Sequence, residues 1–435
     1  MDYRVEPSTL RDALVTVPGD KSISHRALML GSIANGVTDI SGFLAGEDCR
    51  ATLQAFRQLG VEIIERDATT LTINGVGAHG LGAPGDDLDL GNSGTAMRLM
   101  AGLMAGQDFS CTLTGDASLN GRPMGRVITP LTQMGAAIDS DCDGTPPLQI
   151  SGGLRLQGID YEMPMASAQV KSCVLLAGLY ANGRTTVTEP AVTRDHTERM
   201  LRTMGANVTS ERGRISIESG QQLTGTAIEV PADLSSAAFV ILAVLLSNNA
   251  DVLIENVGVN PTRTGVIDIL QSMGGDISLQ NQRSLGDEPV ADIRVKSSTL
   301  GAVVVDPALV SLAIDEFPVL FVAAAAATGK TVFSGIAELR VKESDRIAAM
   351  ATGLRKLGIQ VDESEDGAVV HGGQFSGGSV DSFGDHRIAM AFAIAAGAAT
   401  GPVVITDVDA VETSFPGFAE LMGLLGANIS VESAT

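Results

Sequence analysis

The chain has 435 residues, a length that one hydrophobic core rarely fills, so two domains are expected. A hydrophobic content of 44%, 50 glycines and no tryptophan are typical of a globular, turn-rich protein with aliphatic packing. The formal net charge of −22 disfavours nucleic acid as a partner, because phosphate binding draws on clustered lysines and arginines. Any site for anionic substrates must therefore build a local positive field inside a negative envelope.

No targeting or metal-binding pattern is present. The N-terminal residues 1–13 carry charges and lack an apolar signal-peptide stretch, and the longest apolar stretch, around 317–327, is too short to span a bilayer. The cysteines and the histidines lack metal-ligand spacing. We expect a cytoplasmic protein that has reduced thiols and holds no metal.

Two helical patterns recur in step along the chain. In the first, an amphipathic segment ends at a glycine and a β-type run follows; the glycines are Gly60, Gly135, Gly205, Gly274, Gly358 and Gly426. A glycine in this place is the expected left-handed C-cap. The second pattern is an almost wholly apolar helix followed by a turn and a β-branched strand, at residues 24–40, 96–113, 170–189, 235–255, 317–335 and 388–407.

A helix that is apolar on all sides must be buried, so each of the six units is predicted to have an inner helix with a sheet outside it. Three units per domain is the economical arrangement for an α/β chain of this length. The domains are then residues 21–229 and residues 1–20 with 230–435. If the repeats are arranged in a circle, the strand around Val15–Val17 belongs with the second domain.

The starts of the inner helices hold most of the unusual polar residues, and helix N-termini suit phosphate and carboxylate groups. These residues are Lys21, Ser22 and Arg26; Asn92, Gly94, Thr95 and Arg98; Ser167, Gln169 and Lys171; Asp315 and Glu316; and Asp385, His386 and Arg387. Each serine or aspartate could instead be an ordinary N-cap. An arginine one turn into an apolar helix, such as Arg26 or Arg98, is costly unless an anion meets it.

The segment 339–346 adds Lys342, Glu343 and Arg346. We expect a helix here that places both cations on one face with the glutamate beside them. A solvated, charged helix start is the alternative.

Nine motifs, in order along the whole chain, carry a family resemblance: PGDKSISHR, GNSGTAMR, GRPMGRV, PMASAQVKS, TRDHTE, DEFP, LRVKESDR, GDHRIAM and TSFPGF. They closely resemble the 5-enolpyruvylshikimate-3-phosphate (EPSP) synthases, which are enolpyruvyl transferases of aromatic amino-acid biosynthesis. The resemblance implies a two-domain inside-out α/β barrel of six βαβαββ-type units, three per domain, with an active site in the cleft. It implies transfer of enolpyruvyl from phosphoenolpyruvate to the 5-hydroxyl of shikimate 3-phosphate, without a cofactor, and we expect a monomer.

The resemblance also assigns residues. Shikimate 3-phosphate is expected to contact Lys21, Ser22, Arg26, Ser167, Ala168, Gln169, Arg194, Asp315 and Lys342. Phosphoenolpyruvate is expected to contact Lys21, Gly94, Arg122, Gln169, Arg346 and Arg387. We expect Asp315 to act as base at the 5-hydroxyl, Glu343 and Lys21 to handle the proton at C3, and the domains to close around the substrates.

Two positions separate the chain from one branch of the family. Thr413 stands where that branch has a lysine, and Leu99 stands where it has a proline. Gly94 is an alanine in naturally glyphosate-tolerant members of the other branch. Because a glycine leaves room for this longer mimic of phosphoenolpyruvate, we expect sensitivity to glyphosate.

Three alternatives remain. The transferase that acts on UDP-N-acetylglucosamine uses a mobile-loop cysteine, for which Cys49, Cys111, Cys142 and Cys173 offer no comparable motif. A non-catalytic six-repeat clamp for nucleic acid would need basic inner helices, whereas these are apolar. A related RNA-processing cyclase would have a basic surface, which the pI near 4.5 disfavours.

Overall fold

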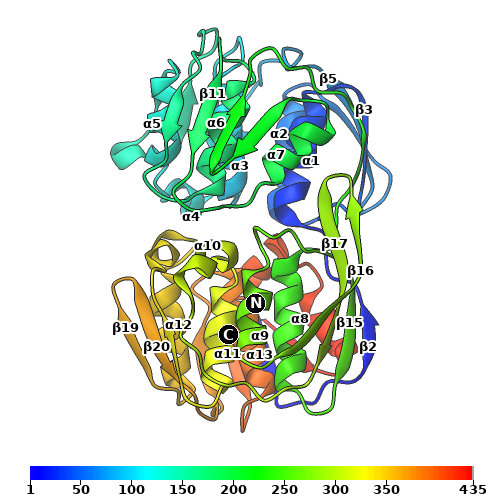
Figure 1. The fold of residues 1–435 in the computed structure, drawn as a ribbon, viewed down its shortest axis with the longest axis vertical. Helices are drawn as coiled ribbons and strands as arrows, with labels where there is room; N and C mark the ends of the chain where they lie inside the picture. The colour runs from blue at the N-terminus through cyan, green and yellow to red at the C-terminus, as the bar shows by residue number, and fades with distance from the viewer. Residues whose placement is uncertain (434–435) are drawn as a thin grey trace. The chain divides into compact units, whose positions relative to one another are not determined.

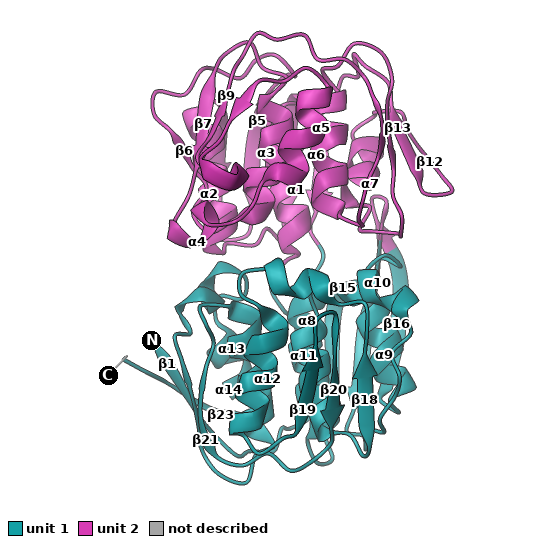
Figure 2. Ribbon diagram, turned by 90° about the vertical axis from the view of Figure 1, so that its left-hand side faces the viewer, with its two compact units in different colours: residues 1–18, 231–283, 289–435 teal, residues 19–230, 284–288 magenta. Residues whose placement is uncertain are grey.

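The computed structural model describes residues 1–433. The chain divides into two compact units, coloured separately in Figure 2. Unit 1 comprises residues 1–18, 231–283 and 289–435, and unit 2 comprises residues 19–230 and 284–288. The domains drawn from the repeats had placed residues 284–288 with the rest of the C-terminal half. The structure assigns them to unit 2, where Glu288 is hydrogen-bonded to His196.

Unit 2 has three buried inner helices, α1 (Lys21–Ser32), α3 (Gly94–Met104) and α6 (Ala168–Gly178), and three sheets. The first sheet has the order β14 (Ala227–Glu229), β3 (Asn35–Ser41), β5 (Leu71–Val76), β4 (Glu62–Glu65). The second is β6 (Leu88–Asp89), β7 (Cys111–Thr114), β9 (Leu148–Ile150), β8 (Ile138–Asp139). The third is β10 (Asp160–Glu162), β11 (Thr185–Thr188), β13 (Arg214–Ile217), β12 (Val208–Glu211).

Unit 1 repeats the plan with inner helices α8 (Leu234–Leu246), α11 (Phe317–Ala326) and α13 (His386–Gly397), which contact one another (Figure 1). Its first sheet is β16 (Asp276–Leu285), β17 (Glu288–Lys296), β15 (Asp251–Gly258), β2 (Ala13–Val15). The second is β18 (Lys330–Phe333), β20 (Gly367–His371), β19 (Val361–Ser364). The third is β21 (Gly378–Asp381), β22 (Val403–Thr406), β1 (Asp2–Glu6), β23 (Asn428–Glu432).

The amphipathic helices are α2 (Glu47–Gln58), α5 (Gly125–Gln133), α7 (His196–Thr203), α9 (Gly265–Ser272), α12 (Arg346–Lys356) and α14 (Phe418–Leu425). All six glycines of the first repeat pattern have a positive φ, between 86° and 104°. This is the left-handed cap that the sequence predicted, and it turns the chain from each helix towards the next strand. Short helices α4 (Ala117–Asn120) and α10 (Val310–Ala313) and the 3₁₀ turns η1 (Cys142–Gly144), η2 (Pro307–Leu309), η3 (Ala337–Val341) and η4 (Asp409–Thr413) complete the elements.

In each unit, strands that are distant in the sequence pair with one another and close the circle of repeats. β2 pairs in parallel with β15 of unit 1, and β14 pairs in parallel with β3 of unit 2. β1 fills an inner position of the last sheet, antiparallel to both β22 and β23. The N-terminal strands therefore belong to unit 1, and the six-unit, inside-out α/β architecture predicted from the sequence is confirmed.

The expectation for residues 342–346 was wrong in one respect. Lys342 follows the 3₁₀ turn η3 with φ −85° and ψ −151°, which is extended backbone. α12 begins only at Arg346, because the side chain of Asp345 accepts a hydrogen bond from the backbone N–H of Ala348 and caps the helix there. The two cations therefore do not share a helical face.

Candidate functional site

The first cationic helix start is that of α1 in unit 2. Asp20 caps it by accepting a hydrogen bond from the backbone N–H of Ile23 at 2.8 Å. Lys21, the first helical residue, forms a close ion pair with Asp48 of α2, and the side chains are 17% and 7% exposed. The partly exposed Lys21 side chain therefore starts from the N-terminus of α1, the positive end of the helix dipole, which favours anions.

Arg26, one turn further along α1, is 3% exposed. Its guanidinium donates to Thr197 Oγ1 at 2.7 Å, Ser172 Oγ at 2.8 Å and the carbonyl of Ser22 at 2.9 Å, all of them neutral acceptors. Burial lowers the pKa of Arg26 to about 10, although the carboxylates of Glu198 and Asp20 oppose this effect. A buried guanidinium with these partners is stabilised by an incoming anion.

The start of α3 is lined by two further guanidinium groups. Ser93 is the N-cap, and its hydroxyl accepts from the backbone N–H of Ala96 at 3.1 Å. A Cβ atom on Gly94 would lie 2.8 Å from Arg98 Nη1 and 3.2 Å from Arg122 Nη1. Only a glycine lets this backbone lie so close to two cations without displacing them.

Gln169 of α6 extends this group. Its Oε1 accepts from Arg98 Nη1 at 2.8 Å, and its Nε2 donates to Thr95 Oγ1 at 3.0 Å. Ser167 caps α6, and Ala168 is its first residue. Arg122 donates to Asn92 Oδ1 and Ser118 Oγ, and Arg194 lies in the segment that joins β11 to α7. The hydrogen bond of Arg98 with Gln169 thus connects the starts of α3 and α6. The sequence indicated that Arg98 needs an anion beside it, but the family resemblance did not assign it to a substrate.

In unit 1, Arg346 is surrounded by three carboxylates although its side chain is only 1% exposed. Its Nε donates to Asp385 at 2.7 Å, and its Nη2 donates to Glu343 at 2.7 Å. Its Nη1 lies 3.6 Å from Asp315 Oδ1, and this nitrogen has no hydrogen-bond partner within residues 1–433. Burial lowers the pKa of Arg346, but the charges of Asp385, Glu343 and Asp315 outweigh it, so that the net pKa is raised.

The other predicted residues of unit 1 converge on Asp315. Lys342 Nζ lies 3.8 Å from Asp315 Oδ1, and Arg387 Nη1 donates to the Asp315 carbonyl at 3.0 Å. Lys342 and Arg346 thus approach one carboxylate from two segments. The hydroxyl of Thr413 donates to Ala410 O at 2.7 Å within η4, so this position offers no cation.

The structure therefore brings Asp315, Lys342, Glu343, Arg346 and Arg387 together in unit 1. In unit 2 the Arg122 guanidinium lies beside Gly94, and Arg26 donates to the carbonyl of Ser22. Gln169 accepts a hydrogen bond from Arg98 of α3. The supporting carboxylates Asp48 and Asp385 are not among the residues assigned from the sequence. Asp385 had been named only as a polar residue at a helix start, where it indeed accepts from the backbone N–H of Arg387.

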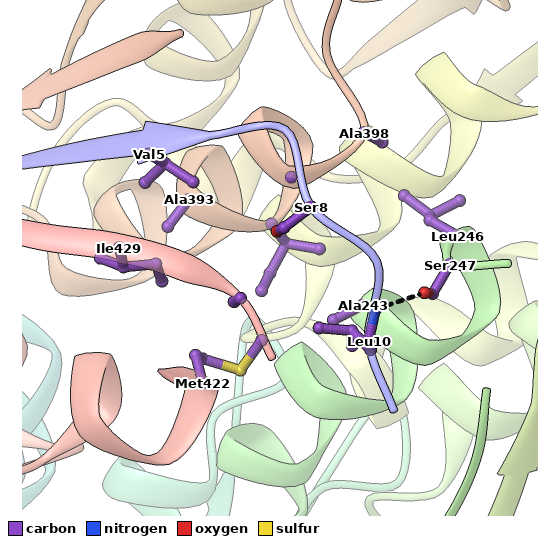
Figure 3. A pocket seen from close by; sticks show the side chains of 13 residues that line it. Val5, Ser8, Leu10, Ala243, Leu246, Ser247, Ala393, Ala398, Met422 and Ile429 are labelled. Carbon is purple, nitrogen blue, oxygen red and sulfur yellow. Dashed lines mark hydrogen bonds between the residues drawn. The ribbon is translucent and has the colours of Figure 1, made fainter. Parts of the chain in front are cut away.

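A cavity of about 30 Å³ with a mostly apolar lining lies elsewhere in unit 1, near Leu10, Ala243, Ala393 and Met422 (Figure 3). Its lining has no charged side chain, so it does not suit a phosphorylated ligand. Within the described 433 residues no helix is long and apolar enough to cross a membrane, and no cluster of three or more His, Cys, Asp or Glu side chains could hold a metal ion.

Comparison with known proteins identifies the family. The model of the EPSP synthase family (3-phosphoshikimate 1-carboxyvinyltransferase) matches residues 5–422. The 3-phosphoshikimate 1-carboxyvinyltransferase of Methylococcus capsulatus is 59% identical over 96% of this chain and 95% of that protein. The protein of the same name from Alkalilimnicola ehrlichii is 58% identical over 99% of this chain and 97% of its own length.

Solved structures agree. One structure of EPSP synthase from Acinetobacter baumannii has a TM-score of 0.88 and 51% identity, and it covers 99% of this chain and 100% of its own. A second structure of that enzyme has a TM-score of 0.89 and 50% identity with full coverage of both chains. The chain belongs to the EPSP synthase family and transfers the enolpyruvyl group of phosphoenolpyruvate to the 5-hydroxyl of shikimate 3-phosphate in aromatic amino-acid biosynthesis.

Proposed function

We propose that the helix starts of unit 2 and the Arg346 cluster of unit 1 together bind the two substrates and transfer protons in this reaction. By the Arg346 cluster we mean Arg346 with Asp315, Glu343 and Asp385. The observation that carries the proposal is that cluster, because it combines two partly exposed carboxylates with a buried cation whose Nη1 has no hydrogen-bond partner within residues 1–433. Proton transfer at two atoms of the substrates needs at least two such titratable groups.

The binding groups are those that the family resemblance assigns, and their charges suit the substrates. Shikimate 3-phosphate is held by Lys21, Ser22, Arg26, Ser167, Ala168, Gln169, Arg194, Asp315 and Lys342, and phosphoenolpyruvate by Lys21, Gly94, Arg122, Gln169, Arg346 and Arg387. The arginine forks match phosphate and carboxylate groups, and each charge-assisted hydrogen bond contributes on the order of 1.5–3 kcal/mol. Lys21, at the positive end of α1, serves both anions.

The reaction is an addition followed by an elimination. Asp315 accepts the proton of the 5-hydroxyl as its oxygen attacks C2 of phosphoenolpyruvate, and C3 gains a proton to become a methyl group. The tetrahedral adduct then loses phosphate and one methyl proton, which restores the double bond. Glu343 and Lys21 deliver and remove the proton at C3. Glu343 is suited to this role because its carboxylate is 26% exposed and is anchored through one oxygen to Arg346.

Replacing Asp315 with asparagine tests the first role. The amide keeps the shape of the side chain but accepts no proton at neutral pH, so kcat should fall by about 10²–10⁴ while the KM values stay within about threefold. Phosphate release under saturating substrates measures this. Asp306→Asn, an exposed N-cap of η2 in the same unit, is the matched control and should keep wild-type turnover. A D315N enzyme with near wild-type kcat would rule out Asp315 as the base.

We also propose that the enzyme works as a cytoplasmic monomer that does not bind nucleic acid. Four free cysteines, three of them buried, fit a reducing compartment. The net charge of −22 opposes association with nucleic acid. Sedimentation of the purified protein, alone and with duplex DNA, tests both statements; a dimer or a co-sedimenting complex would refute the corresponding one.

A further inference from the structure

Unit 2 contains a buried ion cluster formed by Lys171 of α6, Glu189 beyond β11 and Glu198 of α7. Lys171 Nζ lies 2.8 Å from Glu198 Oε1 and 3.1 Å from Glu189 Oε2. The three side chains are only 1%, 5% and 1% exposed, in chain order. The sequence pointed to Lys171 as a polar residue at a helix start, yet the substrate assignments do not use it.

Stability alone is a weak reason for such a cluster. Removing charges from water costs several kcal/mol per ion, and well-packed apolar residues in the same place are often as stable or more stable. This cluster moreover holds two carboxylates against one ammonium group, and Glu198 Oε2 has no hydrogen-bond partner within the described chain. A role in fixing the position of neighbouring groups accounts for the cost.

The first neighbour is the segment that carries Arg194. Lys171 Nζ donates to the carbonyl of Thr193 at 3.2 Å, and Thr193 Oγ1 donates to Glu189 Oε2 at 2.7 Å. Thr193 directly precedes Arg194, and the segment between β11 and α7 has no helix or strand of its own. The cluster therefore anchors the backbone from which the Arg194 side chain extends.

The second neighbour is Arg26. Its guanidinium donates to the hydroxyls of Ser172, which directly follows Lys171, and of Thr197, which directly precedes Glu198. Thr197 Oγ1 in turn donates to Ser172 Oγ at 2.7 Å. The Lys171–Glu198 pair thus joins α6 to α7 at the level where both helices contact the Arg26 guanidinium. The Glu198 carboxylate also opposes the lowering of the Arg26 pKa by burial.

We propose that Lys171, Glu189 and Glu198 are positioning residues for shikimate 3-phosphate, which act by fixing Arg194 and Arg26 and do not touch the substrate. The inference rests on the proposed assignment of these two arginines to that ligand. It predicts an effect on the affinity for one substrate and not for the other. A cluster that served folding alone would change neither affinity in the folded enzyme.

The test is the triple variant K171M, E189Q, E198Q, which removes all three charges and keeps similar side-chain shapes. K171M alone is unsuitable because it would leave two buried carboxylates without a counter-charge. Calorimetric titration with shikimate 3-phosphate should show a dissociation constant raised by about tenfold or more, the value expected when one charge-assisted contact is lost. The KM for phosphoenolpyruvate and kcat at saturating shikimate 3-phosphate should change by less than about twofold.

Thr72→Val is the matched control for stability. It removes a buried hydroxyl that donates to Asp39 at 2.7 Å on the sheet of β14, β3, β5 and β4. Its affinity for shikimate 3-phosphate should equal that of the wild type. If the triple variant does not fold, E189Q alone keeps the Lys171–Glu198 pair and should still weaken the binding of shikimate 3-phosphate by about threefold.

Three results would overturn the inference. The first is an unchanged shikimate 3-phosphate affinity in the folded triple variant or, if that variant does not fold, in E189Q. The second is an equal loss of affinity for both substrates. The third is an Arg194→Gln variant that binds shikimate 3-phosphate as the wild type does, which would also remove the substrate assignment of Arg194. If R194Q weakens binding and the cluster variants do not, the inference fails alone and the assignment stands.

Discussion

At the scale of single residues, the two units treat a buried guanidinium in opposite ways. Arg26 donates its hydrogen bonds to neutral oxygens, and burial lowers its pKa to about 10. Arg346 is surrounded by Asp385, Glu343 and Asp315, which raise its pKa above the ordinary value. The charge of Arg26 therefore faces only neutral hydrogen-bond acceptors, whereas Arg346 lies among carboxylates and keeps only Nη1 without a hydrogen-bond partner within residues 1–433.

Gly94→Ala probes the pocket between Arg98 and Arg122. Because the new methyl group would lie 2.8 Å and 3.2 Å from their guanidinium nitrogens, both side chains must shift outward. The KM for phosphoenolpyruvate should rise about threefold to tenfold, and the concentration of glyphosate that inhibits half the activity should rise more, since glyphosate is the longer molecule. Phosphate-release assays with and without glyphosate measure both values.

Gly423→Ala, on the exposed face of α14 in unit 1, is the control for that experiment and should leave both constants unchanged. A G94A enzyme with the wild-type response to glyphosate would contradict the assignment of Gly94 to the phosphoenolpyruvate pocket.

Helix capping could be predicted from the sequence where a polar side chain stands at the start of an apolar helix, because capping depends on local contacts. Ser167 and Asp385, for which capping was one of the two readings of the sequence, cap α6 and α13. The partners of the cations could not be predicted in this way. Asp48 meets Lys21 from a neighbouring helix, and Glu198 meets Lys171 across α6 and α7, contacts that only the packing of the repeats creates.

At the scale of elements, the glycine caps and the pairing of distant strands follow from the repeat pattern. The segment 342–346 shows where prediction from spacing fails. A spacing of four residues suggested that Lys342 and Arg346 share one helical face, but capping by Asp345 delays the start of α12 to Arg346. A local hydrogen bond therefore outweighed the periodicity of the charges. Lys342 still approaches Asp315, since extended backbone carries its side chain there.

Gly205→Ala tests the cap conformation. Gly205 has φ +95° and nothing within 4 Å of an added Cβ, so the substitution costs only backbone strain, about 1 kcal/mol of unfolding free energy. Gly423 also has open space but ordinary helical backbone, and Gly423→Ala should instead stabilise by about 0.5–1 kcal/mol. Denaturant unfolding of both variants measures the difference; equal effects would mean that the cap is not left-handed in solution.

The tip of the β16–β17 hairpin gives a pH-dependent contribution to stability. Burial raises the pKa of Glu288, but the charge of His196, its hydrogen bond and Arg199 lower the pKa more, so that it lies below the ordinary value of 4.5. The folded state therefore favours the carboxylate. Its contribution is complete above pH 4.5 and is lost as the pH falls through the depressed pKa.

Glu288→Gln should accordingly lower stability by about 1–3 kcal/mol at pH 6, and the difference from the wild type should shrink below pH 4.5. Thermal melting from pH 6 to pH 3.5 follows this. Glu62→Gln on β4, whose carboxylate accepts from Asn74 at the surface, is the control and should show little difference at any pH. A gap between E288Q and the wild type that is constant with pH would refute the ion pair.

At the scale of the whole molecule, the circular order of repeats explains why the chain crosses from one unit to the other and returns. β2, the last strand before the chain enters unit 2, completes a sheet of unit 1, and β14, the last strand before the chain returns, completes a sheet of unit 2. β1 completes the sheet of the last repeat. Periodicity predicted the number of units and their inner helices. It could not predict that residues 284–288 join unit 2, because that assignment depends on single side-chain contacts such as Glu288 with His196.

The formal net charge is −22, whereas most of the side chains proposed to meet the substrates' anionic groups are lysines and arginines, several of them at helix starts. Anion binding is therefore expected to depend on these local cations and not on the overall charge.

The most direct test is phosphate release from phosphoenolpyruvate with one of two acceptors. With shikimate 3-phosphate we expect rapid, saturable release of phosphate that does not depend on added metal ions. With UDP-N-acetylglucosamine we expect release no faster than without an acceptor. Turnover with the nucleotide sugar, or none with shikimate 3-phosphate, would contradict it.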